Sequence, residues 1–203
     1  MSDEERWRSI EDVRAEAIVC CRCDLCRGRT HVVFGSGPVP AAVMIVGEAP
    51  GRQEDAQAKP FVGRAGGLLD KLLKEAGIGR SDVWMTNIVR CRPTDRGNGA
   101  LRDRAPRRDE IGACEMWMNA EYGFVAPQAI LCLCTVASQT LISRGFRISE
   151  GRGRWHEGRF PVPVTSTYHP AYALRVSEKE RGRVRAQMLA DLRMAAASIL
   201  SRQ

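Results

Sequence analysis

The chain lacks any long apolar run. No stretch of about eighteen apolar residues occurs, which is the length that a helix needs to cross a bilayer. Residues 1–16 are charged throughout and lack the apolar centre of a signal peptide. We therefore expect no membrane partner and a cytoplasmic location.

Acidic residues are outnumbered by basic ones. The 203 residues include 31 Lys+Arg against 24 Asp+Glu, a formal net charge of +7. This balance favours a polyanionic partner, most commonly nucleic acid, although a basic surface that only keeps the protein in solution explains it equally well. The length suits one α/β domain with a full core, so we expect a single domain over 1–203 that acts as a monomer.

Eight cysteines in a cytosolic chain argue against disulfides and for a metal or a cluster. Cys20-x-x-Cys23 supplies a local pair, and Cys91 and Cys114 supply two distant thiols. Four thiolates can close one site around Zn²⁺ or around the irons of an Fe–S cluster. The spacing alone leaves four scattered thiols equally compatible with the sequence.

The other cysteines complicate the assignment. Cys21 and Cys26 lie next to the local pair, so the pair can be assigned in more than one way. Cys132 and Cys134 lie in an apolar strand and its turn, where a buried thiol behaves as a small hydrophobe. A lone Cys-x-x-Cys is also a redox motif, but the βαβ context of that motif is missing here.

Apolar runs alternate with amphipathic stretches along the chain. The runs predict strands at 42–47, 83–89, 129–133 and within 159–167. The amphipathic stretches predict helices at 5–19, 65–76, 110–122, 136–142 and 181–200. This alternation is typical of a three-layer α/β/α sandwich with a central, mainly parallel four-stranded sheet.

Two segments fall outside that alternation. Residues 1–40 hold the first helix and the cysteine motif. Residues 94–108 are rich in Arg, Gly, Asp and Pro and have almost no apolar residue, so we predict a long, mobile basic loop there.

The most informative segment follows the first predicted strand. Residues 47–55 read GEAPGRQED and hold three acids, and residues 59–66 read KPFVGRAG and lead into the next helix. Ligands of open α/β sheets bind just outside the carboxyl ends of the strands, and glycine lets the backbone approach them closely. The segment predicts a reaction site within a nucleic-acid-binding protein.

Taken together, the motifs resemble those of the family 4 uracil-DNA glycosylases, the Fe–S-containing branch of the uracil-DNA glycosylase superfamily. The matching elements, in the family's order, are Cys20-x-x-Cys23, VFGxG at 33–37, GEAPGxxED at 47–55, PFVGRAG at 60–66, NxxxCRP at 87–93, Cys114, Arg152-Gly153 and His169-Pro170. The resemblance covers the chain from about Cys20 to its carboxyl end. It implies a monofunctional enzyme of base excision repair that removes uracil from single- or double-stranded DNA and leaves an abasic site.

The family's residues carry over onto the matching positions. The resemblance implies that Phe61 stacks on an extruded uracil, that Asn87 reads its polar edge, and that Glu54 excludes the methyl group of thymine. Glu48 would position the attacking water near C1′, and His169 would donate to uracil O2. Singly, each has an ordinary explanation, such as a core phenylalanine, a helix cap or a turn asparagine.

The resemblance extends to supporting residues. Gly47 and Ala49 would line the substrate site, and Arg64, Arg92 and Arg175 would contact phosphate, although solvated arginine explains the last three nearly as well. The set of Cys20, Cys23, Cys91 and Cys114 would hold a structural [4Fe–4S] cluster.

The chain departs from the family pattern at several positions. Ala171 replaces a usual serine that helps to clamp a phosphate, Ala58 replaces a frequent glycine, and Cys134 replaces a glycine after the third strand. A decayed, non-catalytic Fe–S or zinc DNA-binding module therefore stays an alternative. A longer 94–108 segment also occurs in the branch that couples covalently to uracil-DNA, but this one has no histidine, which that branch uses.

Overall fold

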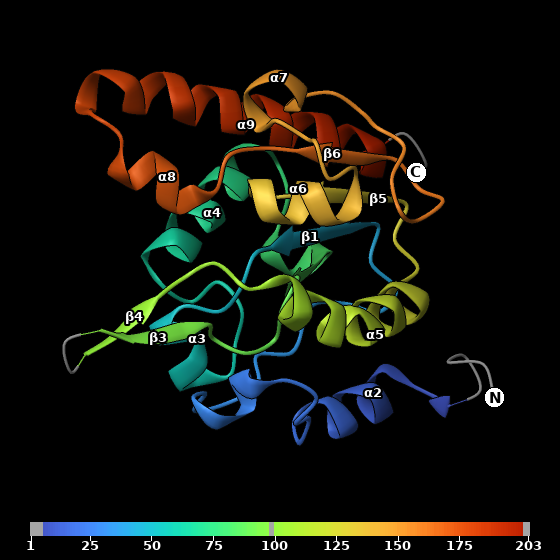
Figure 1. The fold of residues 1–203 in the computed structure, drawn as a ribbon. Coiled ribbons are helices and arrows are strands. Elements are labelled where there is room, and N and C mark those ends of the chain that lie inside the picture. The colour runs from blue at the N-terminus through green and yellow to red at the C-terminus, as the bar shows by residue number, and fades with distance from the viewer. Residues whose placement is uncertain (1–5, 98–99, 201–203) are drawn as a thin grey trace.

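The computed structural model describes residues 6–97 and 100–200 (Figure 1). Its centre is a four-stranded sheet in the order β2-β1-β5-β6, with parallel pairing throughout. The strands are β1 (Val43–Gly47), β2 (Val83–Asn87), β5 (Ala129–Cys132) and β6 (Val164–Ser166). Every residue of these strands is buried, as expected for a parallel sheet covered on both faces.

The register aligns the carboxyl ends of neighbouring strands. Gly47 pairs with Asn87, Val46 pairs with Cys132, and Cys132 pairs with Ser166. The segments that follow the strands therefore leave the sheet along one edge.

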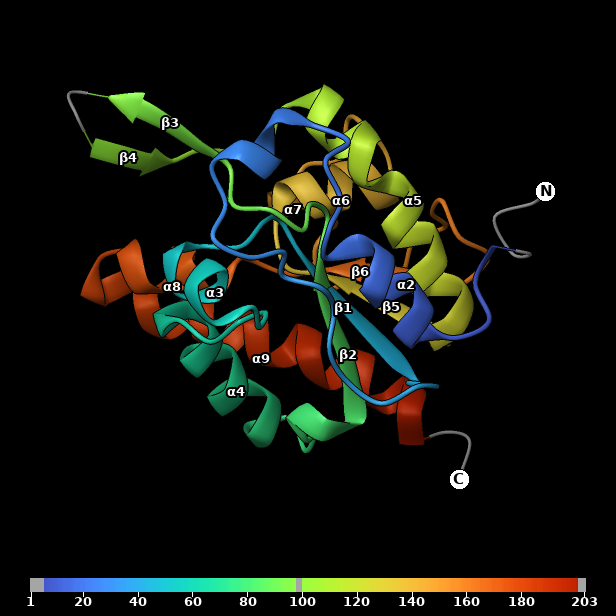
Figure 2. The same cartoon turned by 90° about the horizontal axis from the view of Figure 1, so that it is seen from below.

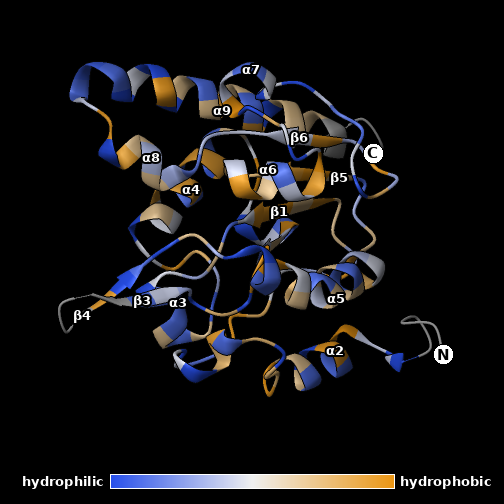
Figure 3. Ribbon diagram, in the orientation of Figure 1, coloured by the Kyte–Doolittle hydropathy of each residue, from blue (hydrophilic) through white to orange (hydrophobic). Residues whose placement is uncertain are grey.

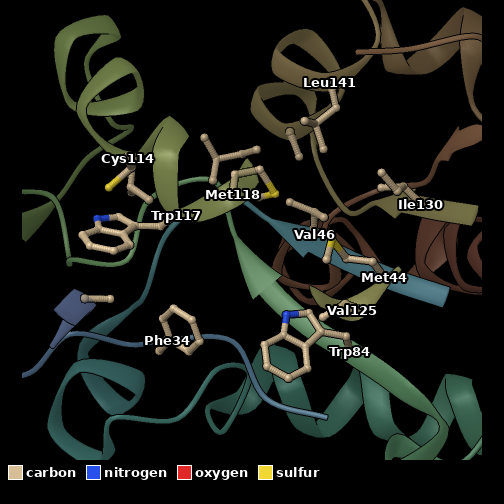
Figure 4. Close-up of a cluster of buried hydrophobic side chains, with 14 of the residues drawn as sticks. Phe34, Met44, Val46, Trp84, Cys114, Trp117, Met118, Val125, Ile130 and Leu141 are labelled. Atoms are coloured by element: carbon tan, nitrogen blue, oxygen red, sulfur yellow. The ribbon is translucent and has the colours of Figure 1, made fainter. Parts of the chain in front are cut away.

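Helices cover one face of the sheet with apolar residues of α2 (Ile10–Ala17), α5 (Arg108–Val125) and α6 (Thr135–Leu141). Met44 and Val46 of β1 point into this layer, where Trp117 and Met118 of α5 pack (Figure 4). Cys114 lies in the same cluster, beside Trp117.

The opposite face is covered by α4 (Arg64–Glu75), α8 (Pro170–Arg175) and α9 (Glu178–Leu200). Val43 and Ile45 of β1 point into this layer, so successive residues of one strand serve opposite faces. Figure 3 shows α9 with mixed hydrophilic and hydrophobic residues, in keeping with one buried and one exposed side. The predicted three-layer α/β/α sandwich is confirmed. In the described part of the chain, no helix combines the length and the apolar character needed to cross a membrane.

The element boundaries differ modestly from those predicted. The helix predicted at 5–19 runs over Ile10–Ala17, and residue 5 lies outside the described residues. The strand predicted at 83–89 ends at Asn87, although Ile88 and Val89 still donate to the carbonyls of Gly47 and Glu48. The single-domain prediction also includes 1–5, 98–99 and 201–203, which lie outside the described residues, and it stays a prediction.

Some short elements were not predicted. They are the 3₁₀ helices η1 (Asp24–Arg27) and η2 (Arg80–Asp82) and the helices α3 (Arg52–Gln57), α7 (Ile148–Gly151) and α8 (Pro170–Arg175). The segment that follows β1 is thus partly helical, because α3 occupies its second half.

The prediction of a long loop over 94–108 is wrong. Strands β3 (Thr94–Gly97) and β4 (Ala100–Asp103) pair antiparallel there, and α5 begins at Arg108. Charge pairing at the base of this hairpin stabilises it in place of apolar contacts, so hydrophobic periodicity gave no sign of it. Arg92 Nε lies 2.6 Å from Asp103 Oδ1, and Arg104 Nε lies 3.0 Å from Asp95 Oδ1.

Candidate active site at the carboxyl edge of the sheet

A cavity of about 340 Å³ lies at the carboxyl edge of the sheet. It contains most of the side chains that the sequence nominated for catalysis or base recognition: Glu48, Ala49, Glu54, Phe61, Asn87, His169 and Arg175. They come from segments more than a hundred residues apart. The parallel register brings these segments together, because Glu48 follows β1, Asn87 ends β2, and His169 comes shortly after β6.

Gly47 does not line the cavity, but its lack of a side chain allows two cavity residues to pack against its backbone. A Cβ atom at this position would lie 2.4 Å from Asn87 Oδ1 and 2.6 Å from Phe61 Cζ. Both distances are far below van der Waals contact, so any other residue would displace both side chains. The sequence predicted a glycine for close backbone approach, and here the close neighbours are two site residues.

Phe61 has an unusual backbone. Its φ is +54°, in the left-handed region that non-glycine residues rarely adopt, and its side chain is buried. Arg80 holds this conformation, because its Nη1 donates to the Phe61 carbonyl at 3.0 Å and to Asp70 Oδ1 at 2.8 Å. A Cβ atom on Gly66 would lie 1.8 Å from the same carbonyl oxygen. Sequence patterns carry no sign of this role of Arg80, because the contact spans nineteen residues.

The two acids of α3 have separate tasks. Glu54 lines the cavity, and its Oε1 accepts from the backbone N–H of Gly63 at 2.8 Å. Asp55 is buried, and its Oδ1 accepts from the N–H groups of Thr30 at 2.9 Å and His31 at 3.2 Å. Asp55 thus ties the segment after the cysteine motif to the site.

Glu48 is a carboxyl group in a partly buried setting. Burial raises its pKa above the usual value, and the positive charge of Arg175 acts in the opposite direction. Among the described residues, no group donates a hydrogen bond to its carboxylate, so the lone pairs are free to hold a water molecule.

His169 is the N-cap of α8, and its Nδ1 accepts from the backbone N–H of Ala171 at 3.0 Å. An acceptor Nδ1 places the proton of the neutral ring on Nε2, which is then a hydrogen-bond donor. Burial and the positive charge of Arg175 together lower the pKa of His169 to about 4, while the charge of Glu54 acts in the opposite direction. The ring is therefore a neutral donor at physiological pH.

Two departures from the family pattern lie close to these groups. Ala171 lines the cavity and donates its N–H to His169. Cys134 is the buried N-cap of α6, where its Sγ accepts from Ala137 N at 3.2 Å, and burial raises its pKa to about 12. At neutral pH this cysteine is a protonated thiol.

Arg64 and Arg92 do not line the cavity. Arg64 is the first residue of α4 and is exposed. The guanidinium of Arg92 is engaged by Asp103, and its side chain is only 11% exposed. Their contact with phosphate stays a prediction.

The base of the β3–β4 hairpin adds residues that the sequence did not nominate. Pro93, Asp103 and Arg104 line the cavity. Arg104 makes a bidentate pair with Glu110 of α5, with distances of 2.6 and 2.7 Å. The paired guanidinium fixes one wall of the cavity against α5.

Cys20, Cys23, Cys91 and Cys114 line a second, smaller cavity. Cys20 lies in the segment after α2, Cys23 is the N-cap of η1, Cys91 lies in the segment after β2, and Cys114 lies within α5. This cavity brings together all four thiols of the predicted ligand set, and Cys21 and Cys26 do not line it.

Three arginines, Arg22, Arg29 and Arg90, line the cavity with these thiols. Arg29 Nη1 donates to the Cys20 carbonyl at 2.6 Å and lies 3.2 Å from Cys91 Sγ. Burial raises the pKa of Cys91 to about 12 and also raises that of Cys114. In the described part of the chain, no three His, Cys, Asp or Glu side chains are placed to share one metal ion.

Comparison with known proteins adds a family and named relatives. The model of the Uracil DNA glycosylase superfamily matches residues 34–193. A Type-4 uracil-DNA glycosylase of Pyrobaculum aerophilum is 37% identical over 163 residues, covering 77% of this chain and 80% of that protein. One of Thermotoga maritima is 36% identical over 183 residues, covering 88% and 90%. A crystal structure of wild-type Pedobacter heparinus SMUG2 has a TM-score of 0.49 at 11% identity, covering 80% of this chain and 77% of that chain.

Proposed function

Because this chain belongs to the uracil DNA glycosylase superfamily, we propose that it hydrolyses the N-glycosidic bond of deoxyuridine in DNA and leaves an abasic site. The observation that carries the proposal is the shared cavity of Glu48, Phe61, Asn87 and His169. It combines an aromatic face, an amide, a free carboxylate and a neutral imidazole donor. The protein acts as a monomer, and its substrate is single- or double-stranded DNA that contains uracil.

Recognition begins with extrusion of the base. The scissile bond is not accessible inside a duplex, so the nucleotide must rotate out by about 180°. Stacking of uracil on Phe61 recovers about 1–3 kcal/mol of the stacking energy that is lost. The Arg80 contact that fixes the Phe61 backbone supports this role, because it sets the ring in place before the base arrives.

Selection of uracil rests on Asn87 and Glu54. A side-chain amide offers a donor and an acceptor together, which matches O4 and N3–H of uracil and mismatches the reversed pattern of cytosine. Glu54 is fixed by the Gly63 N–H at 2.8 Å, so it forms a wall that does not yield to the methyl group of thymine.

The reaction breaks the N1–C1′ bond, and the bonding electron pair leaves with uracil. Positive charge develops at the sugar and negative charge on the base, and a site gains rate by stabilising charge that appears only then. His169 Nε2–H donates to uracil O2, where the negative charge accumulates. Glu48 holds the water whose oxygen bonds to C1′, and its negative charge favours the positive sugar. The water proton passes to the carboxylate, and the departing uracil anion is reprotonated from solvent.

Arginines guide the DNA backbone toward the cavity. Arg175 lies in the cavity wall and is exposed, so its guanidinium can meet a phosphate next to the extruded nucleotide. Exposed Arg64 extends this surface. Arg92 contributes to DNA binding by pairing with Asp103, which holds the base of the hairpin in place. Where that pair opens, the guanidinium of Arg92 binds a phosphate instead.

We propose that the four-thiol cavity is the site of a structural [4Fe–4S] cluster. One cavity is lined by four thiols, those of Cys20, Cys23, Cys91 and Cys114. A cubane cluster binds four thiolates at four separate irons, whereas a single zinc ion needs all four thiolates within bonding distance of one atom. A bound cluster would cross-link α2, the end of β2 and α5, and it supplies no step of the hydrolysis. Visible absorbance near ~400 nm together with about four irons per chain supports this proposal, and a colourless zinc protein contradicts it.

The test of the function is uracil release from a labelled oligonucleotide under single-turnover conditions. We expect alkali-labile abasic sites with uracil but not with a thymine mismatch. Glu48→Gln and His169→Ala should each slow release by about two to three orders of magnitude, whereas Glu157→Gln, at an exposed glutamate remote from the cavity, should leave it unchanged. Binding without abasic sites would favour the non-catalytic module, and a heat- and detergent-stable adduct would favour covalent trapping.

A further inference from the structure

The β3–β4 hairpin stands beside the mouth of the cavity. Figures 1 and 2 show it projecting from the body at the end of the molecule where α8 and α3 lie. Its base contributes Pro93, Asp103 and Arg104 to the cavity wall. DNA whose extruded nucleotide occupies the cavity must therefore pass next to the hairpin.

From this placement we infer that the hairpin is a docking arm for the sugar-phosphate backbone that flanks the extruded nucleotide. The inference rests on the proposed function, and it adds a contact surface that lies outside the catalytic cavity. The docking arm comprises β3, β4 and Arg108, which follows the hairpin at the start of α5.

The acids at the base of the docking arm are already neutralised. Asp103 pairs with Arg92 at 2.6 Å, and Asp95 pairs with Arg104 at 3.0 Å. Glu110 accepts from Arg104 at 2.6 Å. These carboxylates therefore hold the base of the arm together and do little to repel an approaching phosphate.

Two arginines of the docking arm remain available. Arg102 and Arg108 are exposed, and among the side chains that the structure describes neither makes an ion pair or a hydrogen bond. Next to Arg102 in the chain, Leu101 exposes 50% of its surface. Because successive strand residues point to opposite faces, the arm presents Arg102 on one face and Leu101 on the other. A nucleic acid offers phosphates for the first and apolar sugar or base surfaces for the second.

The arm is preorganised for this contact. Arg104 N donates to the Pro93 carbonyl at 3.2 Å and closes the base of the hairpin. The base also faces the η1 segment, where Asp24, Leu25 and Gly28 share a small cavity with Thr94. A two-stranded ribbon has the width that a DNA major groove admits, and four residues of strand reach about 13 Å.

The test measures DNA affinity against salt concentration for the full-length protein, with a uracil-free duplex as the probe. Neutralising one phosphate-contacting arginine should lower the slope of log K against log[salt] by about 0.9. We expect this loss in Arg102→Ala and Arg108→Ala. Arg193→Ala, an exposed arginine of α9, is the matched control and should retain the parent slope. If all three variants kept the salt slope of the parent protein, the docking arm would be refuted.

Leu101→Ala gives an independent reading. It removes an apolar contact and no charge, so it should weaken binding severalfold while the salt slope stays at the parent value. Unchanged affinity in Leu101→Ala would remove the leucine from the arm's contact surface. Circular dichroism verifies that each variant keeps the parent fold.

The outcome separates the docking arm from the proposed function. Binding of uracil-free DNA measures the contribution of the docking arm without any reaction. Uracil release measures the proposed enzymatic activity. Reduced slopes in a protein that releases no uracil would support the arm and refute the glycosylase. If the protein releases uracil but the arginine variants keep the parent salt slope, the glycosylase is supported and the docking arm is refuted. If both hold, the variants should raise KM for uracil-DNA and leave kcat unchanged.

Discussion

Arg90 offers the sharpest test of how the site is held in place. Its side chain is 1% exposed, and that of its partner Glu121 is fully buried, with Nη2 3.1 Å from Oε1. Arg90 Nη1 also donates to the carbonyls of Asn87 at 2.7 Å and Ile88 at 3.0 Å. The guanidinium thus fixes the backbone that presents the uracil-reading amide.

We predict that Arg90→Met destabilises the fold by about 3 kcal/mol. Removing one partner of a buried ion pair typically costs about 3–5 kcal/mol. Glu121 keeps donors from Trp84 Nε1 at 3.0 Å and Gly35 N at 3.3 Å, so the lower end of that range applies. In a chain of this length, about 3 kcal/mol lowers the midpoint of thermal unfolding by about 6–12 °C.

Two further variants make the assay decisive. Arg147→Met breaks an exposed pair with Glu150, whose side chains are 76% and 68% exposed, and should change stability by less than about 1 kcal/mol. Adding Glu121→Gln to Arg90→Met removes the unpaired charge and should recover part of the loss. The reasoning fails if Arg90→Met unfolds at the same temperature as Arg147→Met when followed by circular dichroism.

Further predictions concern the cavity and the cysteines. Gly47→Ala should lower kcat/KM for uracil release by about a hundredfold, because the new Cβ would collide with Asn87 Oδ1. The ¹⁵N shifts of His169 should show a proton on Nε2 and not on Nδ1, with titration near pH 4. Because this pKa lies below the ordinary 6.5, the unfolded state takes up the proton first, and stability falls as pH drops from about 6.5 to about 4. Cys114→Ser should reduce the bound iron and the visible absorbance of the purified protein.

Matched variants decide these outcomes. Gly67→Ala places its Cβ in open space on α4 and should keep the parent rate, so equal losses in both alanine variants would contradict the packing argument. A His169 that titrates near pH 6.5 would show a solvated ring and remove the neutral donor. Cys132→Ser alters a buried thiol outside the four-thiol cavity, and loss of iron there equal to that in Cys114→Ser would refute the ligand assignment.

The sheet was readable from sequence because buried parallel strands are continuous apolar runs. Val43–Gly47 and Ala129–Cys132 lie inside the predicted ranges, and the parallel register explains why residues after different strands meet. The membership of Glu48, Asn87 and His169 in one cavity was predicted through the family motifs.

Charge-stabilised features were not readable. The hairpin at 94–103 has few apolar residues, and its base depends on pairs such as Arg104 with Glu110, which no periodicity reveals. Polar α3 was missed for the same reason. Arg80 and Arg90 hold backbone carbonyls of the site, and sequence patterns carry no sign of side chain-to-backbone contacts of this kind.

A crystal structure with free uracil bound would test the central claim most directly. The account predicts the uracil ring against Phe61, its O4 and N3–H edge within hydrogen-bond distance of the Asn87 amide, and O2 facing His169 Nε2. Uracil bound away from this cavity, or bound in it with these contacts made to solvent, would contradict the account.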